Sequence, residues 1–267
     1  MEIAVGSRPG IPQRGDSEAY VAEIVAPGVV LLAVAHGFGR IRERSAPAVA
    51  AQTVRDSVRR RVRNERRDPR AALAAAVSAA NARVFAHSGS TDDFVASGSS
   101  LTAALILGDQ AVVAHVGATR AYLSRDGSLQ PLTVDDAVGT PPVRLLTRAL
   151  GTQPTLDPSI ANLRLMHGDA LVLSSGALHE LLGDDEIADA LRVSVSSEAV
   201  TARLLAIASI RGEGAATVIV GRALTDAPSD GKLTRRPPVR EAAILLAAML
   251  AATIVAIFML HGMFTAA

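Results

Sequence analysis

The chain has 267 residues, of which 49% are hydrophobic, 20% charged and 3% aromatic, with a formal net charge of +1. This balance excludes a disordered chain and predicts a core built from aliphatic side chains. A near-neutral charge does not favour nucleic acid as a partner, and the absence of cysteine excludes disulfides, thiolate metal sites and a cysteine nucleophile.

The first half of the chain predicts a β-hairpin, two helices and a group of strands. Apolar runs at 20–25 and 29–35 flank a turn at Pro27 and Gly28, which is typical of a hairpin. Ala, Val and Leu at helical spacing predict helices over 45–62 and 69–86. Short turns then separate four runs that predict an antiparallel meander, at 99–107, 111–116, 120–124 and 129–132.

The second half predicts a Gly/Pro-rich loop at 139–142 and then a mixture of strands and helices. Strands are expected near 160–165, 170–174 and 216–221, and helices at 177–182, 184–191 and 198–210. Because strands and helices come in groups and do not alternate, residues 1–222 are expected to form one α+β domain in which helices cover antiparallel sheets.

The C-terminal region differs from this domain. Residues 242–260 carry no charge and are long enough to cross a bilayer, so we expect a transmembrane helix over 241–264, the alternative being a buried helix. A Pro-rich, basic linker, 223–240, precedes it. By the positive-inside rule, and because the N-terminus has no signal-peptide pattern, we expect a single-pass membrane protein whose N-terminal domain is cytoplasmic.

Five segments carry a resemblance to a known family. The longest, 98–136, reads GSSLTAALILGDQAVVAHVGATRAYLSRDGSLQPLTVDD, and the others are LLAVAHGFGR, LTRALG, GDALVLSSGALHELL and TVIV. In this order they resemble motifs of the PPM-type (type 2C) metal-dependent protein serine/threonine phosphatases, in their short bacterial form. The resemblance implies an α-β-β-α sandwich of two packed antiparallel sheets with helices outside. It also implies a family cofactor of two or more Mg²⁺ or Mn²⁺ ions held by aspartates.

Most positions that match the family's metal ligands carry no carboxylate here. The family's aspartates correspond here to His36, Ala118, Gly176 and Gly214, and only Asp16 remains acidic. Gly37, a turn glycine of the same motif, follows His36. One carboxylate and an imidazole cannot neutralise two dications, so we expect neither a bound metal cofactor nor catalytic residues. The phosphate-binding arginine falls on Ile11, and Arg8 or Arg14 could replace it only in a shifted loop.

The resulting prediction is a membrane-tethered pseudophosphatase with a regulatory or binding role in Ser/Thr phosphorylation signalling. Its expected partner is a phosphoprotein or a Ser/Thr kinase, not nucleic acid. Two alternatives remain open. One is a residually active or alternatively metallated phosphatase that recruits other acids, such as Asp92, Asp93, Asp184 or Asp185. The other is a purely structural membrane-associated module.

Other residues allow competing interpretations. His36, His115 and His179 lack the spacing of metal ligands, which favours structural histidines over a shared metal site. A nucleophile at Ser174 or Ser175 with His179 as its base lacks a third group. Segment 55–70 has eight arginines against three acids. It is either a solvated helix end or a surface for anionic lipid or an acidic partner.

Overall fold

The computed structural model describes residues 1–9, 17–38, 45–64, 68–88, 98–140 and 143–223. The helices are α1 (Ala46–Asn64), α2 (Pro69–Ser88), α3 (Gly176–Leu181), α4 (Asp184–Val193) and α5 (Ser197–Arg211). The strands are β1 (Glu2–Arg8), β2 (Ser17–Ala26), β3 (Val29–Phe38), β4 (Gly98–Leu107), β5 (Gln110–Val116), β6 (Arg120–Arg125), β7 (Ser128–Pro131), β8 (Ala137–Thr140), β9 (Val143–Leu146), β10 (Ser159–Arg164), β11 (Ala170–Ser174) and β12 (Ala216–Arg222).

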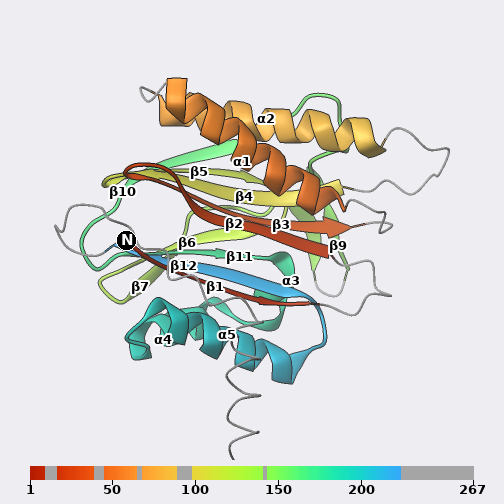
Figure 1. The fold of residues 1–267 in the computed structure, drawn as a ribbon. Helices are drawn as coiled ribbons and strands as arrows, with labels where there is room; N and C mark the ends of the chain where they lie inside the picture. The colour runs from red at the N-terminus through yellow and green to blue at the C-terminus, as the bar shows by residue number, and fades with distance from the viewer. Residues whose placement is uncertain (10–16, 39–44, 65–67, 89–97, 141–142, 224–267) are drawn as a thin grey trace, which may run out of the picture. The chain divides into compact units, whose positions relative to one another are not determined.

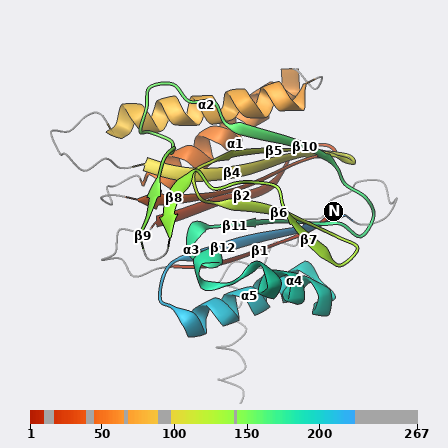
Figure 2. The same ribbon diagram turned by 180° about the vertical axis from the view of Figure 1, so that it is seen from behind.

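Two five-stranded antiparallel sheets form the centre of the domain. Neighbouring strands follow the order β10-β5-β4-β3-β2 in one sheet and β1-β12-β11-β6-β7 in the other. Helices α1 and α2 cover the first sheet, and α3, α4 and α5 lie against the second (Figure 1, and from behind Figure 2). This is the expected α-β-β-α sandwich.

Two parts of the expected strand arrangement are wrong. The four strands predicted as one meander divide between the sheets, because β5 pairs with β4 and β10 whereas β6 pairs with β11 and β7. Gly117, with φ +97°, lies in the short connection where the chain passes from one sheet to the other. The predicted loop at 139–142 overlaps a small hairpin of β8 and β9.

Strict alternation along β3 assigns its side chains to two different layers. Leu31, Ala33 and Ala35 are fully buried in the cluster that the first sheet forms with α1 and α2. Leu32 and Val34, also at 0% exposure, point to the opposite face, toward the second sheet. The next residue on that face is His36, so alternation aims it at the space between the sheets.

The second helical layer closes the other side of the sandwich. Val172, Val218 and Val220 of the sheet share a buried cluster with Ile187 of α4 and Leu204 of α5. Each such side chain, moved out of water, contributes about 1.5–3 kcal/mol to stability. Both hydrophobic clusters therefore lie between a sheet and its helices, and not between the two sheets.

None of the helices in the described part of the chain is long and apolar enough to cross a membrane. The predicted transmembrane helix over 241–264 lies outside the described residues, as does the predicted linker apart from residue 223.

Candidate functional site

The end of β3 places His36 beside a carboxylate of the neighbouring strand. β2 pairs with β3 so that Glu18 lies opposite His36. Nδ1 of His36 is 3.8 Å from Oε1 of Glu18, and the two side chains are 21% and 6% exposed. A nearly buried acid and a partly buried imidazole thus meet at the edge of the sandwich.

Two further positions that the sequence analysis singled out lie close to His36. Gly176 begins α3 directly after β11, and a Cβ atom added to it would lie 3.3 Å from Nδ1 of His36 and 3.5 Å from the carbonyl oxygen of Ala118. Ala118 itself lies in the turn between β5 and β6, where its N–H donates to the Ser100 hydroxyl at 3.0 Å. His36, Ala118 and Gly176, far apart in sequence, therefore converge at one point.

Gly214 and Arg8 approach each other at the start of β12. The Arg8 guanidinium donates to the Gly214 carbonyl oxygen at 2.6 Å, which connects the end of β1 to this turn. A Cβ atom on Gly214 would lie 4.0 Å from that of Ala177, so there is room for a side chain. Gly37 has none, since a Cβ atom there would lie 2.6 Å from Pro47.

Glu18 is a carboxylate of this region that the sequence analysis did not single out. Its Oε2 accepts a hydrogen bond from the Thr217 hydroxyl at 2.5 Å. Since that hydroxyl donates to Glu18, it must accept from Ser7, whose Oγ lies 3.0 Å away. Hydroxyls from β1 and β12 thus hold an acid of β2 in place across the two sheets.

These residues do not fit the binuclear metal centre that the family resemblance implies. Hard dications need several oxygen ligands whose charge offsets their own. Within the described residues, no group of three or more His, Asp or Glu side chains is placed to hold a metal ion. The convergent positions offer an imidazole, a glycine and an alanine, with Glu18 beside them. Asp16, Arg14, Asp92 and Asp93 lie outside the described residues.

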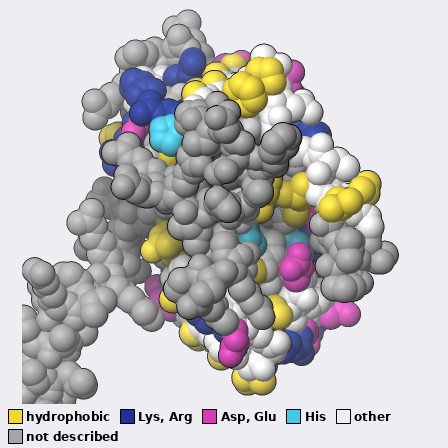
Figure 3. Space-filling model, turned by 90° about the vertical axis from the view of Figure 1, so that its right-hand side faces the viewer, with side chains coloured by type: hydrophobic (Ala, Val, Ile, Leu, Met, Phe, Trp, Pro, Cys, Tyr) yellow, Lys and Arg dark blue, Asp and Glu magenta, His cyan; other side chains and the backbone are white. Residues whose placement is uncertain are grey.

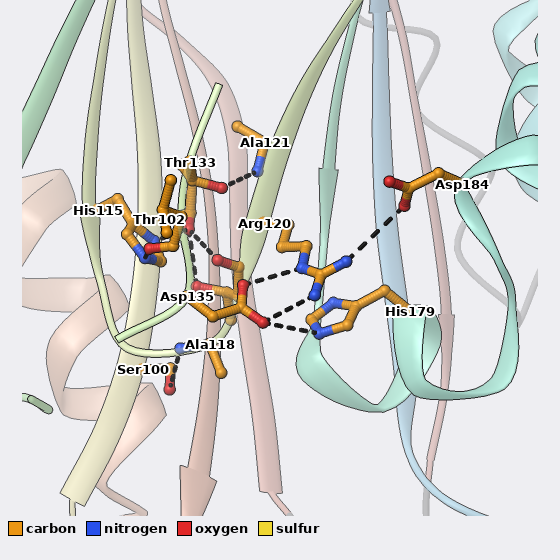
Figure 4. Close-up of polar contacts among 12 residues, drawn as sticks. Ser100, Thr102, His115, Ala118, Arg120, Ala121, Thr133, Asp135, His179 and Asp184 are labelled. Carbon is orange, nitrogen blue, oxygen red and sulfur yellow. Dashed lines mark hydrogen bonds and ion pairs between the residues drawn. The ribbon is translucent and has the colours of Figure 1, made fainter. Parts of the chain in front are cut away.

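Next to this site, hydrogen bonds and ion pairs join Arg120, Asp135 and Asp184 in a second network (Figure 4). Arg120 donates through Nε and Nη2 to the two oxygens of Asp135, both at 2.8 Å, and this pairing raises the pKa of Arg120. Tyr122 donates to Asp184 at 2.9 Å, and burial raises the pKa of the Tyr122 hydroxyl to about 12. Asp184, one of the acids that an alternatively metallated phosphatase would recruit, is therefore a hydrogen-bond acceptor in this network.

His115 has the contacts of a structural histidine. It is 2% exposed, and burial lowers its pKa, so the ring is neutral. Nε2 lies 3.1 Å from the carbonyl oxygen of Val134, which can only accept, so Nε2 carries the proton. Nδ1 lies 3.0 Å from the Thr102 hydroxyl, which is also 3.0 Å from the carbonyl oxygen of Thr119. Both ring nitrogens are occupied within the fold.

The serines near His179 do not form a nucleophile and base pair. Ser174 and Ser175 are both at 0% exposure. The Ser175 hydroxyl accepts the backbone N–H of Thr217 at 3.0 Å, and that of Ser174 has no hydrogen bond to a described residue. Asp135 lies 3.8 Å from Nε2 of His179, which is too long for a hydrogen bond. No described group presents an activated hydroxyl to solvent here.

The face at this end of the sandwich is shown in Figure 3. Histidine side chains reach the surface near its centre, beside an acidic one.

Comparisons with known proteins agree with this fold. The family model described as Protein phosphatase 2C matches residues 28–139. The serine/threonine protein phosphatase PstP of Mycobacterium tuberculosis is 32% identical over 224 residues, which is 78% of this chain and 42% of PstP. The chain thus spans less than half the length of that curated relative.

Two solved structures with manganese or an arsenic oxyanion are also similar. One is the catalytic domain of PstP in complex with two manganese ions, with a TM-score of 0.69 and 28% identity over 84% of this chain and 98% of that one. The other is the PPM Ser-Thr phosphatase MsPP of Mycobacterium smegmatis in complex with cacodylate, with a TM-score of 0.68 and 27% identity over 84% of this chain and 99% of that one.

Proposed function

Because the chain belongs to the PPM-type (protein phosphatase 2C) family of serine/threonine phosphatases, we propose that it is a pseudophosphatase that binds a partner in Ser/Thr phosphorylation signalling. The observation that carries this proposal is the convergence of His36, Ala118 and Gly176 without a carboxylate among them. The positions that match the family's ligands are close together, but the chemistry needed to hold two dications is missing.

The substitutions are physically consistent with one another. A cluster of carboxylates without its metal ions repels itself, and its pKa values rise. Glycine and alanine at Gly176, Gly214 and Ala118 avoid this cost in a domain that holds no metal. In place of metal ions, the contacts of Glu18 with Thr217 and His36 hold the strands together at this site.

Manganese titration of the full-length protein tests the proposal. We expect no saturable Mn²⁺ binding by calorimetry, and no Mn²⁺-dependent release of phosphate from a phosphothreonine peptide in the same samples. Micromolar binding together with metal-dependent turnover would instead establish the residually active or alternatively metallated phosphatase. In that case, Asp16→Asn and Glu18→Gln would identify which acid had been recruited.

We further propose that residues 241–264 anchor the protein in a membrane, with the phosphatase-like domain on the cytoplasmic side. The uncharged run at 242–260 and the basic residues before it support this placement. Fractionation of cells that express the full chain, or the chain cut after residue 240, tests it. The full chain should resist carbonate extraction, and the shortened one should appear in the soluble fraction.

A further inference from the structure

The two helical layers of the domain carry opposite charge. Helices α1 and α2 contain seven arginines and a single acid, Asp56, whereas α3, α4 and α5 contain six acids and three arginines. The chain as a whole has a formal charge of only +1. Figure 3 shows arginine side chains (dark blue) gathered over the upper part of the molecule, next to a histidine. Positive charge is thus concentrated on one layer.

The fold itself uses only part of this charge. Arg55 pairs with Asp56 at 3.1 Å, and Arg59 pairs with Glu23 of β2 at 3.0 Å. The other arginines of the layer whose side chains are described form neither a hydrogen bond nor an ion pair with a described residue. They are Arg60, Arg61, Arg70 and Arg83.

Helix dipoles do not explain all of these arginines. Cations are stabilised in the last turn of a helix and disfavoured in the first. Arg61, in the last turn of α1, fits this rule, whereas Arg60 precedes that turn. Arg70 lies in the first turn of α2, and Arg83 precedes the last turn, in which His87 is the basic residue. A favourable position at a helix end therefore accounts for only one of these four arginines, Arg61.

A cleft between the two helices brings several of these groups together. It has a volume of about 110 Å³, and its polar lining comes from Gln52, Thr53, Asp56 and Arg60 of α1 and from Arg83 and His87 of α2. The Thr53 hydroxyl is already bonded to the carbonyl of Val49 at 2.7 Å, and Asp56 is paired with Arg55. The guanidinium groups of Arg60 and Arg83 remain to contact a ligand.

We propose that this α1–α2 cleft binds a phosphorylated Ser or Thr side chain of a partner protein, with its phosphate between Arg60 and Arg83. Guanidinium groups bind phosphate oxygens through paired, charge-assisted hydrogen bonds. Phe85, 37% exposed, is the only large hydrophobic residue of the layer that is exposed among the described residues, which favours a protein over insertion into a lipid surface. This inference names the partner's chemistry and rests on the proposed binding function.

Fluorescence anisotropy with the full-length protein tests the proposal. The probe is a labelled pool of peptides with one central phosphothreonine and randomised flanks, compared with the same pool carrying threonine. We expect binding of the phosphorylated pool only, competition by inorganic phosphate, and a loss of affinity of at least 10-fold in Arg60→Glu/Arg83→Glu. Arg83→Gln, which removes charge without reversing it, should give a smaller loss in the same direction. Arg203→Glu, an exposed change on α5, is the matched control and should bind as the wild type does.

Other outcomes would overturn the inference. Equal binding of both pools, no binding of either, or full affinity in Arg60→Glu/Arg83→Glu would each do so. Sedimentation with phosphatidylcholine vesicles, with and without phosphatidylserine, covers the lipid alternative. If the protein binds the anionic vesicles but not the phosphopeptides, and this binding needs the arginines, the layer is a lipid-binding surface. Loss of phosphopeptide binding in His36→Ala but not in Arg60→Glu/Arg83→Glu would place recognition at the degenerate site, which refutes the cleft while the proposed function survives.

Discussion

Carboxylates restored at two of the convergent positions should destabilise the metal-free protein and make its stability depend on manganese. In His36→Asp/Gly176→Asp, the new side chains replace an imidazole nitrogen and a Cβ position that are 3.3 Å apart, with Glu18 a further 3.8 Å from the first. Two unit charges about 4 Å apart repel by about 4 kcal/mol at the effective dielectric of a protein surface. Partial protonation limits the cost, because the pKa of one carboxyl will rise.

Thermal unfolding followed by circular dichroism measures this effect. A cost of about 3 kcal/mol corresponds to a fall in Tm of about 6–12 °C in EDTA for a domain of this size. Manganese at 100 times its Kd should return about 2.7 kcal/mol to the variant and nothing to the wild type. Gly183→Asp is the control for adding a carboxylate: a Cβ atom there would meet nothing within 4 Å, and aspartate is favoured at this N-cap of α4, so the Tm should not fall. If the double variant is as stable as the wild type in EDTA and insensitive to manganese, the positions do not converge and the reasoning fails.

Two further predictions concern the polar residues around the site. Asp135→Ala leaves Arg120 without its bidentate partner and should lower the free energy of unfolding, measured in urea, by about 3 kcal/mol. Asp189→Ala, which breaks an exposed pair, should lower it by less than about 0.5 kcal/mol. Equal costs would contradict this. His115, whose pKa burial lowers from 6.5, takes up a proton more readily when unfolded. Its contribution to stability is complete above pH 6.5 and is lost as the pH falls below that value, so His115→Asn should flatten the stability curve between pH 7 and pH 5.

The fold could be predicted from the sequence wherever pairing is local. The β2 and β3 hairpin and both long helices were predicted correctly, because a short turn and helical spacing are visible within 20 residues. β1 was missed because its partner is β12, where Glu2 pairs with Arg222. β5 and β6 follow each other closely yet join different sheets, and only the packing of the two sheets decides that.

The candidate site shows the same limit at the level of single residues. The predicted turn at Pro27 and Gly28 pairs Ala26 with Val29, and by continuation it would place Glu18 opposite Gly37. An irregularity between Ile24 and Ala26 shifts the register by one residue, so that Glu18 lies opposite His36. A shift of one residue turns every side chain to the other face. The sequence does not show this irregularity, so the pairing of Glu18 with His36 could not be predicted from it.

The location of the site explains how this domain can keep its fold without the family's ligands. His36, Ala118 and Gly176 lie where strands end, and none belongs to either hydrophobic cluster. Replacing a carboxylate there removes neither buried apolar area nor sheet pairing, so fold stability and metal chemistry depend on different residues. A chain that loses the metal therefore retains its outer helices as rigid surfaces, and in the arginine-rich layer of α1 and α2 the fold uses only part of the charge, through Arg55 and Arg59.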